Sequence, residues 1–372
     1  MRSLPVLATM FLCSAAMATA VPLEFETGRP AIDLKINGKG PYRLLFDTGS
    51  GAGLILDKSL ADELGLKANG KRRIGDPNSP EAIEADTMKI GRVALGDLAL
   101  KNVEAISWSR EGIGAGATRG VVGLPLFGAR VVTLDYPGHK FIVESGGLPE
   151  PDGHTVLSAT FEDGIPSVPI DVAGVAYRAH LDSGSTGFIG MPLAAADKLP
   201  LDGPVAKVGR ARTASGDYSV SEGKLSGYLR VGDILLEGPK LRFVGLPNAN
   251  LGSDFLRSMV VSVDSKNARV KLVASGKPPE PSERPRLGVM SHGMKDGRFS
   301  VDDVAAGSPA EAAGLKAGDQ IVSLNDQPVA DMSPFQLSQA LAARPLAIAL
   351  LRDGAPVHLT VADPAASPPV HP

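Results

Sequence analysis

The sequence predicts a mostly β protein made of two similar lobes with a cleft between them, followed by a small α+β unit. Short alternating apolar runs that meet at hairpin turns indicate strands, while long helical periodicity is scarce. An internal repeat indicates two lobes, and a change of pattern after a proline-rich stretch indicates a further unit. A chain of 372 residues is long enough for two or three domains.

The repeat is marked by an aspartate that ends an apolar run and precedes a hydroxyl residue, a glycine and a serine. Phe46-Asp47-Thr48-Gly49-Ser50 and Leu181-Asp182-Ser183-Gly184-Ser185 share this pattern, with their aspartates 135 residues apart. Further landmarks follow each aspartate in the same order: Gly96-Asp97 and Gly232-Asp233, then Val121-Val122-Gly123 and Asn250-Leu251-Gly252, then Val131 to Asp135 and Val260 to Asp264. This shared order predicts a duplication.

Each copy begins with a hairpin. Ile32 to Ile36 alternates and meets Asn37-Gly38, a strong two-residue hairpin signal. Val168 to Val172 and Val175 to Leu181 repeat the hairpin around Gly174.

The sequence also predicts two short helices and the following boundaries. The helices are Lys58 to Leu66 and Leu193 to Leu199; the boundaries are a signal peptide at 1–20, lobes at 21–148 and 149–273, a proline-rich linker at 274–283, the third unit at 284–361 and a disordered tail at 362–372.

Residues 1–20 have the features of a secretory signal peptide: Arg2, an apolar run and the small residues Ala18-Thr19-Ala20. A retained N-terminal anchor is the alternative, although the run is too short to span a bilayer. Cys13 is the single cysteine, and the large residues before it argue against lipid attachment. The chain left after cleavage has no cysteine for a disulfide. For an exported protein this favours the periplasm of a Gram-negative bacterium, or secretion.

The net charge is −3, and it becomes −4 when Arg2 leaves with the signal. Such mild acidity argues against a nucleic-acid or anionic-membrane partner, and no membrane span is expected after signal removal. The six histidines are scattered without ligand spacing, so neither a metal site nor another cofactor is predicted. The sequence contains no Gly-x-Ser-x-Gly signature, so a serine hydrolase is not predicted.

Paired aspartates suit amide hydrolysis without a covalent intermediate. One group must deprotonate water, and another must protonate the carbonyl oxygen or the leaving nitrogen. Two carboxylates a few ångströms apart cannot both ionise, so the pair keeps one proton and titrates as a unit. We therefore interpret Asp47 and Asp182 as candidate catalytic residues.

The flanking residues have expected supporting roles. The hydroxyls of Thr48 and Ser183 are expected to donate to backbone across the lobe interface. Gly49 and Gly184 allow close backbone approach to the carboxylates. Ser50 and Ser185 are expected to hydrogen-bond the outer carboxylate oxygens.

Over roughly residues 23–273 the chain resembles the two-lobed pepsin and retropepsin-like aspartic proteases. The matching residues are the two Asp-containing turns and the downstream apolar-apolar-Gly elements, which thread beside the turns in that family. Val121-Val122-Gly123 fits this element, whereas Asn250-Leu251-Gly252 has asparagine at one apolar position. The resemblance implies two β-barrel lobes, an endopeptidase activity, peptide or protein substrates and no cofactor.

The family also closes a flap hairpin over the substrate. Arg212 to Tyr218 is expected to form a flap tip in the second lobe. The matching stretch of the first lobe, Ile74 to Asp86, has no tyrosine, so the pepsin-type flap tyrosine is not carried over. Short lobes without disulfides favour a fused retropepsin-like duplication.

Gly307 to Ile321 carries the second specific pattern. Ser308 is placed as a helix N-cap, Pro309 at the first helical position and Gly314 at the end, before a strand from Gln320 to Leu324. This run resembles a PDZ domain, which implies capture of a peptide C-terminus. By the resemblance, Leu287-Gly288-Val289 is the carboxylate-binding loop, and a helix from Phe335 to Ala343 places Leu337 and Leu341 along the groove. The alternative is that these two leucines belong to the core.

Two rival functions stay open beside an aspartic endopeptidase. One is a protease-like double lobe that no longer cleaves but binds peptides or scaffolds a cell-envelope complex. The other is a dimer whose aspartate pair forms between chains, which is disfavoured because each chain already carries both halves.

Overall fold

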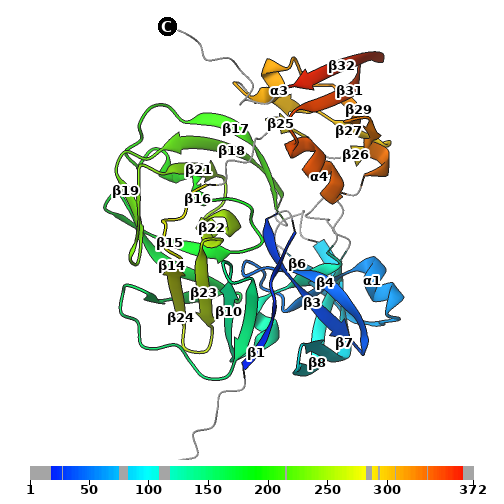
Figure 1. Cartoon of the computed structure of the whole chain (residues 1–372). Helices are drawn as coiled ribbons and strands as arrows, with labels where there is room; N and C mark the ends of the chain where they lie inside the picture. The colour runs from blue at the N-terminus through cyan, green and yellow to red at the C-terminus, as the bar shows by residue number, and fades with distance from the viewer. Residues whose placement is uncertain are drawn as a thin grey trace, which may run out of the picture.

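The computed structural model describes residues 18–26, 28–74, 83–108, 118–213, 216–281, 287–291, 294–305, 307–332 and 334–362. It is mostly β, as predicted, with two lobes and a C-terminal unit (Figure 1). One buried apolar core runs through both lobes, and a separate core lies in the C-terminal unit. In the described part of the chain, no helix is long and apolar enough to cross a membrane.

The first lobe is an eight-stranded sheet in the order β2-β3-β4-β9-β5-β8-β7-β6. Its strands are β2 (Glu24–Glu26), β3 (Arg29–Ile36), β4 (Lys39–Phe46), β5 (Leu54–Asp57), β6 (Ala68–Ile74), β7 (Ile83–Leu95), β8 (Leu98–Trp108) and β9 (Gly120–Val122). The expected turn at Asn37-Gly38 joins β3 to β4. Helix α1 (Lys58–Glu63) and the 3-10 turn η1 (Leu124–Phe127) complete the lobe, α1 being shorter than predicted.

The second lobe repeats this plan in a ten-stranded sheet, in the order β17-β18-β21-β16-β22-β15-β14-β19-β20 with β13 paired to β14. Its strands are β13 (Thr160–Glu162), β14 (Ile165–Val172), β15 (Val175–Asp182), β16 (Ile189–Pro192), β17 (Ala206–Thr213), β18 (Gly216–Lys224), β19 (Tyr228–Val231), β20 (Ile234–Glu237), β21 (Lys240–Val244) and β22 (Ala249–Gly252). Only a 3-10 turn, η2 (Leu193–Ala195), forms where the second helix was expected.

A six-stranded sheet joins the lobes, in the order β1-β11-β10-β23-β24-β12. Its members are β1 (Ala18–Pro22), β10 (Val131–Asp135), β11 (Lys140–Glu144), β12 (Val156–Ser158), β23 (Met259–Asp264) and β24 (Arg269–Ala274), with helix α2 (Ser253–Leu256) before β23. The matched strands β10 and β23 pair at its centre, and Thr133 Oγ1 donates to Ser262 Oγ (2.8 Å). Each lobe thus supplies half of one sheet, which fixes the lobes relative to each other.

Strand β1 bears on the predicted signal peptide. Ala18, Thr19 and Ala20 pair with β11, so cleavage after Ala20 would remove three of the five residues of β1. The apolar run before them and the predicted tail lie outside the described residues, apart from Ala362.

The C-terminal unit contains two small sheets and two helices. They comprise β25 (Val289–Met290) with β28 (Asp303–Val304); β26 (Met294–Lys295), β27 (Arg298–Ser300), β29 (Gln320–Leu324), β30 (Gln327–Pro328), β31 (Leu346–Arg352) and β32 (Ala355–Val361); and α3 (Pro309–Ala312), η3 (Val329–Asp331) and α4 (Pro334–Ala342). The predicted N-cap is present, since Ser308 Oγ accepts from Glu311 N (3.2 Å). This unit contacts the second lobe through β17 and β25, and Lys207 Nζ lies 3.8 Å from Asp303 Oδ2 (Figure 1).

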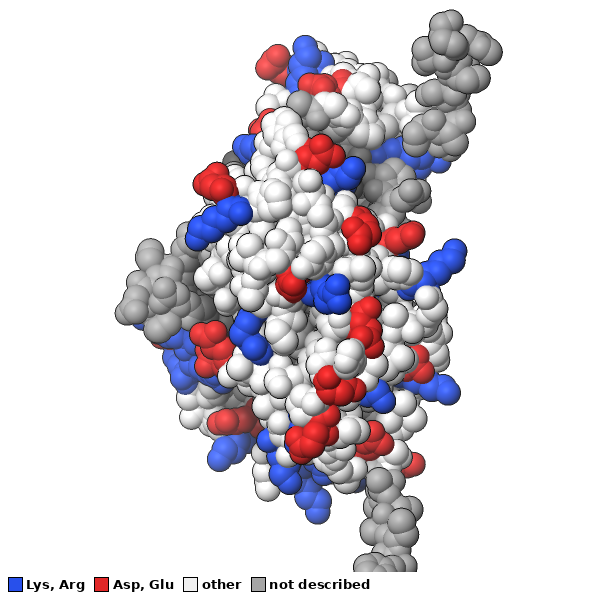
Figure 2. Space-filling model, turned by 90° about the vertical axis from the view of Figure 1, so that its left-hand side faces the viewer, with Lys and Arg blue, Asp and Glu red and all other residues white. Residues whose placement is uncertain are grey.

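Charges are mixed over the surface. Figure 2 shows Lys and Arg interspersed with Asp and Glu on one face of the molecule, without a large region of one sign. This distribution agrees with the near-neutral composition.

Candidate active site

The two Asp-containing turns emerge from equivalent places in the two lobes. Asp47 follows β4, which pairs in parallel with β9, and Asp182 ends β15, which pairs in parallel with β22. The apolar-apolar-Gly elements therefore lie beside the turns, as the resemblance implied. Each pairing carries its aspartate out of the core to the lobe boundary.

Thr48 and Ser183 lock the turns together. Thr48 Oγ1 donates to Leu181 O (2.6 Å), and Ser183 Oγ donates to Phe46 O (2.8 Å). Each hydroxyl also accepts from the opposite backbone: Ser183 N to Thr48 Oγ1 (2.9 Å) and Thr48 N to Ser183 Oγ (3.0 Å). Both residues are fully buried, so these four bonds replace water for groups that would otherwise be unsatisfied.

The glycines explain how the carboxylates come so close. A methyl group on Gly49 would lie 2.7 Å from Asp182 Oδ1, and one on Gly184 would collide with the Asp47 carboxyl group. Each aspartate thus packs against the opposite turn at a distance that only glycine permits. The two carboxyl groups also share a hydrogen bond.

Burial and the neighbouring carboxylate set the electrostatics of the pair. Burial first, and then the negative charge of Asp182, raise the pKa of Asp47 to about 7, while the hydrogen bond from Gly49 N (2.8 Å) acts in the opposite direction. The pair therefore retains a proton across acidic pH.

Ser50 and Ser185 do not have the partners we predicted. Ser50 Oγ donates to Ala52 O (3.2 Å), and Ser185 Oγ accepts from Gly187 N (3.2 Å). Ser185 instead reaches the carboxylate through its backbone, since Ser185 N donates to Asp182 Oδ1 (2.9 Å). The reason is geometric: a sharp turn directs its N–H groups inward and leaves the short hydroxyls bonded within the turn.

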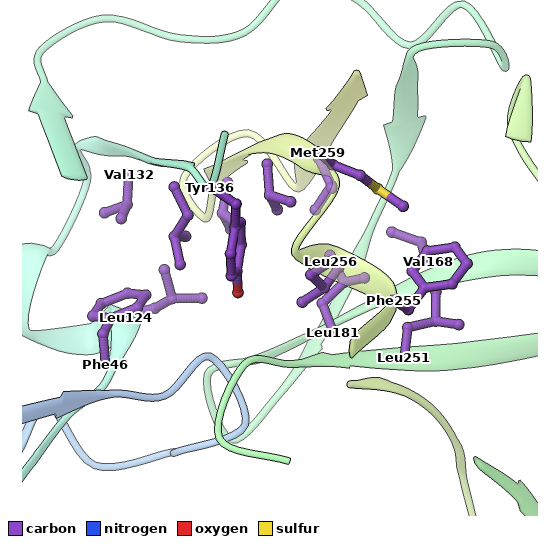
Figure 3. Close-up of a cluster of buried hydrophobic side chains, with 14 of the residues drawn as sticks. Phe46, Leu124, Val132, Tyr136, Val168, Leu181, Leu251, Phe255, Leu256 and Met259 are labelled. Atoms are coloured by element: carbon purple, nitrogen blue, oxygen red, sulfur yellow. The ribbon is translucent and has the colours of Figure 1, made fainter. Parts of the chain in front are cut away.

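Three residues near the pair were not assigned a role from the sequence. Asn250 Nδ2 donates to Asp182 Oδ2 (3.1 Å), and the buried Ser253 Oγ donates to Ser183 O (2.6 Å). Tyr136 is buried beneath the turns, close to Ser253, among apolar side chains of both lobes (Figure 3). Burial, with the negative charges of Asp182 and Asp47, raises the pKa of Tyr136, so its hydroxyl stays neutral. The asparagine that interrupts the second apolar-apolar-Gly element was the available sequence signal.

Apolar surface and a cavity adjoin the pair in the first lobe. Leu45, Ile55 and Val121 form a small buried cluster, against which Ala52 and Trp108 pack. A cavity of about 420 Å³ lies next to the Asp47 turn, lined by Gly51 to Leu54, the flap strands β6 and β7, β8, and Pro125 and Leu126. All of the residues that line this cavity belong to the first lobe, and neither aspartate is among them.

Both lobes carry a hairpin at the expected flap position. Arg212 pairs with Asp217 across β17 and β18, and Ile74 pairs with Ile83 across β6 and β7. The tips, residues 214–215 and 75–82, lie outside the described residues.

The residues predicted to bind a peptide in the third unit lie in two kinds of place: some form a loop, and others belong to the apolar core. Gly288 has φ +84°, and a side chain there would collide with Ser308. Leu287 O and Gly288 O accept from Ala310 N and Ala305 N (both 2.8 Å), which fixes the loop. Leu287 is buried in the core, and Leu337 and Leu341 are partly buried against it. These three side chains therefore have a structural role in the core of this unit.

Comparisons with known proteins agree with this geometry. A family model described as aspartyl protease matches residues 32–125 and 168–255, one segment in each lobe, and a PDZ domain model matches residues 277–351. The two lobes are an aspartyl protease domain, and the C-terminal unit is a PDZ domain. Together they indicate a peptidase with a peptide-recognition domain.

A relative from Caulobacter vibrioides, named metalloprotease MmpA, is 38% identical over 73 residues. These residues are 19% of this chain, and the chain spans only 18% of that relative's length. Within the described part of this chain, no group of three or more His, Cys, Asp or Glu side chains could hold a metal ion.

Proposed function

We propose that this protein is an aspartic endopeptidase in which Asp47 and Asp182 activate water for attack on a peptide bond. The observation that supports this most strongly is the joined pair: two carboxyl groups in hydrogen-bonding contact, held by reciprocal bonds between Thr48 and Ser183. A pair that keeps one proton offers a base and an acid together. The cavity beside the Asp47 turn supplies space for the substrate.

The PDZ domain is proposed to recognise peptide or protein segments and bring them to the lobes. Tethering through a second binding site raises the effective concentration of substrate near the cleft. We also propose, from residues 1–20 and the lack of other cysteines, that the protein is exported to the periplasm or secreted.

The decisive experiment is cleavage of a denatured protein by the purified protein, with and without pepstatin. We expect cleavage that pepstatin inhibits. Asp47→Asn and Asp182→Asn should each abolish it while the protein stays folded, because a neutral amide cannot complete the acid-base pair. The double variant should lose little more than either single variant, since the two groups act as a unit.

The same experiment distinguishes an aspartic endopeptidase from the rival function, a protease-like protein that binds peptides without cleaving them. A folded protein that binds peptides but cleaves none, at any pH between acidic and neutral, would indicate a protease-like binding protein. Substantial activity in either single variant would contradict the assignment of the pair.

A further inference from the structure

The environments of the two aspartates differ at matched positions. The strands beside them pair in the same register in both lobes, which allows a residue-by-residue comparison. The matched residues are Leu45, Val121 and Ile55 in the first lobe, and His180, Asn250 and Gly190 in the second. The surroundings of Asp47 are therefore apolar. The surroundings of Asp182 are polar, and a glycine stands there in place of an isoleucine side chain.

The polar side supplies an additional donor to Asp182. Asp182 Oδ2 accepts from Asn250 Nδ2 (3.1 Å), and Asp182 Oδ1 accepts from Ser185 N (2.9 Å). Asp47 Oδ1 accepts from Gly49 N (2.8 Å), but the residue matched to Asn250 is Val121, which has no side-chain donor. Hydrogen bonds to a carboxylate favour its ionised form, so these contacts favour the anion on Asp182.

A second difference lies beneath the turns. Ser253, which follows Gly252, donates to the carbonyl oxygen of Ser183 (2.6 Å) within the second Asp-containing turn. The matched residue after Gly123 is Leu124, which is buried and has no hydroxyl to donate. The turn that carries Asp182 is thus held by a side-chain bond for which the other lobe has no matched donor.

We propose that the shared proton rests on Asp47, that Asp182 is the ionised base, and that Asn250 is the positioning residue that makes the pair unequal. The proposal rests on the function proposed above and assigns separate roles within it. Asp182 takes a proton from water as the water oxygen bonds to the peptide carbonyl carbon, and Asp47 gives its proton to the carbonyl oxygen. When the C–N bond breaks, Asp182 passes its proton to the leaving nitrogen, and Asp47 recovers one from a hydroxyl of the intermediate.

The other ionisable groups around the pair do not reverse the assignment of the proton to Asp47 and of the negative charge to Asp182. Arg29 lowers the pKa of Asp47, but burial and Asp182 outweigh it and raise that pKa to about 7. Burial lowers the pKa of His180, which Asp182 and Glu162 oppose, so His180 is neutral at neutral pH. Tyr136 stays protonated because its pKa is raised.

The test is a titration of each aspartate in the absence of the other, followed by ¹³C NMR of labelled carboxyl carbons. Asp47→Asn leaves Asp182, and Asp182→Asn leaves Asp47. We expect Asp182 to titrate at lower pH than Asp47. Adding Asn250→Val, the residue of the matched position, to Asp47→Asn removes the amide donor to Asp182 Oδ2, so Asp182 should then need a higher pH to ionise.

The control is Asn267→Ala, since Asn267 Nδ2 bonds a different carboxylate, Asp264 Oδ2 (2.8 Å), and should leave Asp182 unchanged. Asn250→Ala repeats the test with a smaller side chain if valine prevents folding. In the otherwise intact enzyme, either Asn250 variant should move the acidic limb of kcat/KM to higher pH.

Titration of Asp182 at or above the pH of Asp47 would overturn the proton assignment. An unchanged Asp182 in both Asn250 variants would overturn the role of Asn250. Because the titrations need no proteolysis, they stand even if the proposed peptidase activity is not found.

Discussion

The hydroxyl groups of Thr48 and Ser183 form reciprocal hydrogen bonds across the lobe boundary. Each hydroxyl accepts from the backbone N–H of the other residue, and each donates to the carbonyl oxygen of the residue just before the other's aspartate. The two Asp-containing turns are therefore one structural unit, although 135 residues separate their aspartates. Changes in either turn should affect both aspartates.

Thr48→Val should weaken both the lobe contact and activity. Valine keeps the shape but removes the donor to Leu181 O and the acceptor for Ser183 N, which leaves buried groups unpaired. The expected cost is roughly 1–3 kcal/mol of unfolding free energy. Thr48→Ser, which retains the hydroxyl, should be mild. Denaturant unfolding and peptide cleavage should be measured on the same samples; wild-type values for Thr48→Val would contradict the proposed lock.

Gly184→Ala should disrupt the pair more than a surface glycine change does. Its methyl group would collide with the Asp47 carboxyl group, so the turns must separate. We expect a loss of at least tenfold in kcat/KM, with reduced thermal stability. The control is Gly91→Ala, because Gly91 is exposed in β7 and an added methyl group would meet only Asn37 Oδ1, at 3.4 Å. Normal cleavage by Gly184→Ala would show that the carboxylates are not as close as described.

The stability of the lobes should depend on pH through Asp47. Its pKa is raised from 3.8 to about 7 on folding, so the folded state binds more protons than the unfolded state between these values. The stabilising contribution is therefore complete below about pH 3.8 and is lost as pH rises through about 7. Asp47→Asn should remove this dependence and be more stable than wild type at pH 8. Unfolding at several pH values checks this, and an unchanged slope in the variant would contradict it.

The PDZ domain should affect substrate choice more than bond cleavage. It has its own core, and its described contacts with the lobes include one exposed ion pair, Lys207 with Asp303, which contributes little to stability. A truncation after Pro281 keeps the bond from Arg257 to Glu280 O, and should cleave short peptides with nearly unchanged kcat.

The same truncated protein should lose rate on long substrates whose C-termini can reach the PDZ domain. Comparing both proteins on both substrates decides the matter. Equal losses on short and long substrates would mean that the PDZ domain instead supports the active arrangement of the lobes. Lys207→Ala in the full-length protein then shows whether the ion pair carries that support.

The sequence by itself determined the β class, the duplication, the two aspartates and the PDZ domain. These features depend on local patterns: an apolar strand ends at an Asp-containing turn, and Ser308-Pro309 begins a helix whatever surrounds it. Tertiary structure decided how the halves meet. The six-stranded sheet pairs β10 with β23, and no local pattern encodes which strand edges join.

Tertiary structure also decided which groups bond the carboxylates. Ser50 and Asn250 show this most clearly. The serine was expected to reach a carboxylate because it lies close in sequence, yet its hydroxyl bonds within the turn, while the asparagine, 68 residues from Asp182, donates to it. Hydrogen-bond partners in a buried site depend on distances and directions that only the packed chain sets. The sequence identified the acids, and the packing of the two lobes made them unequal.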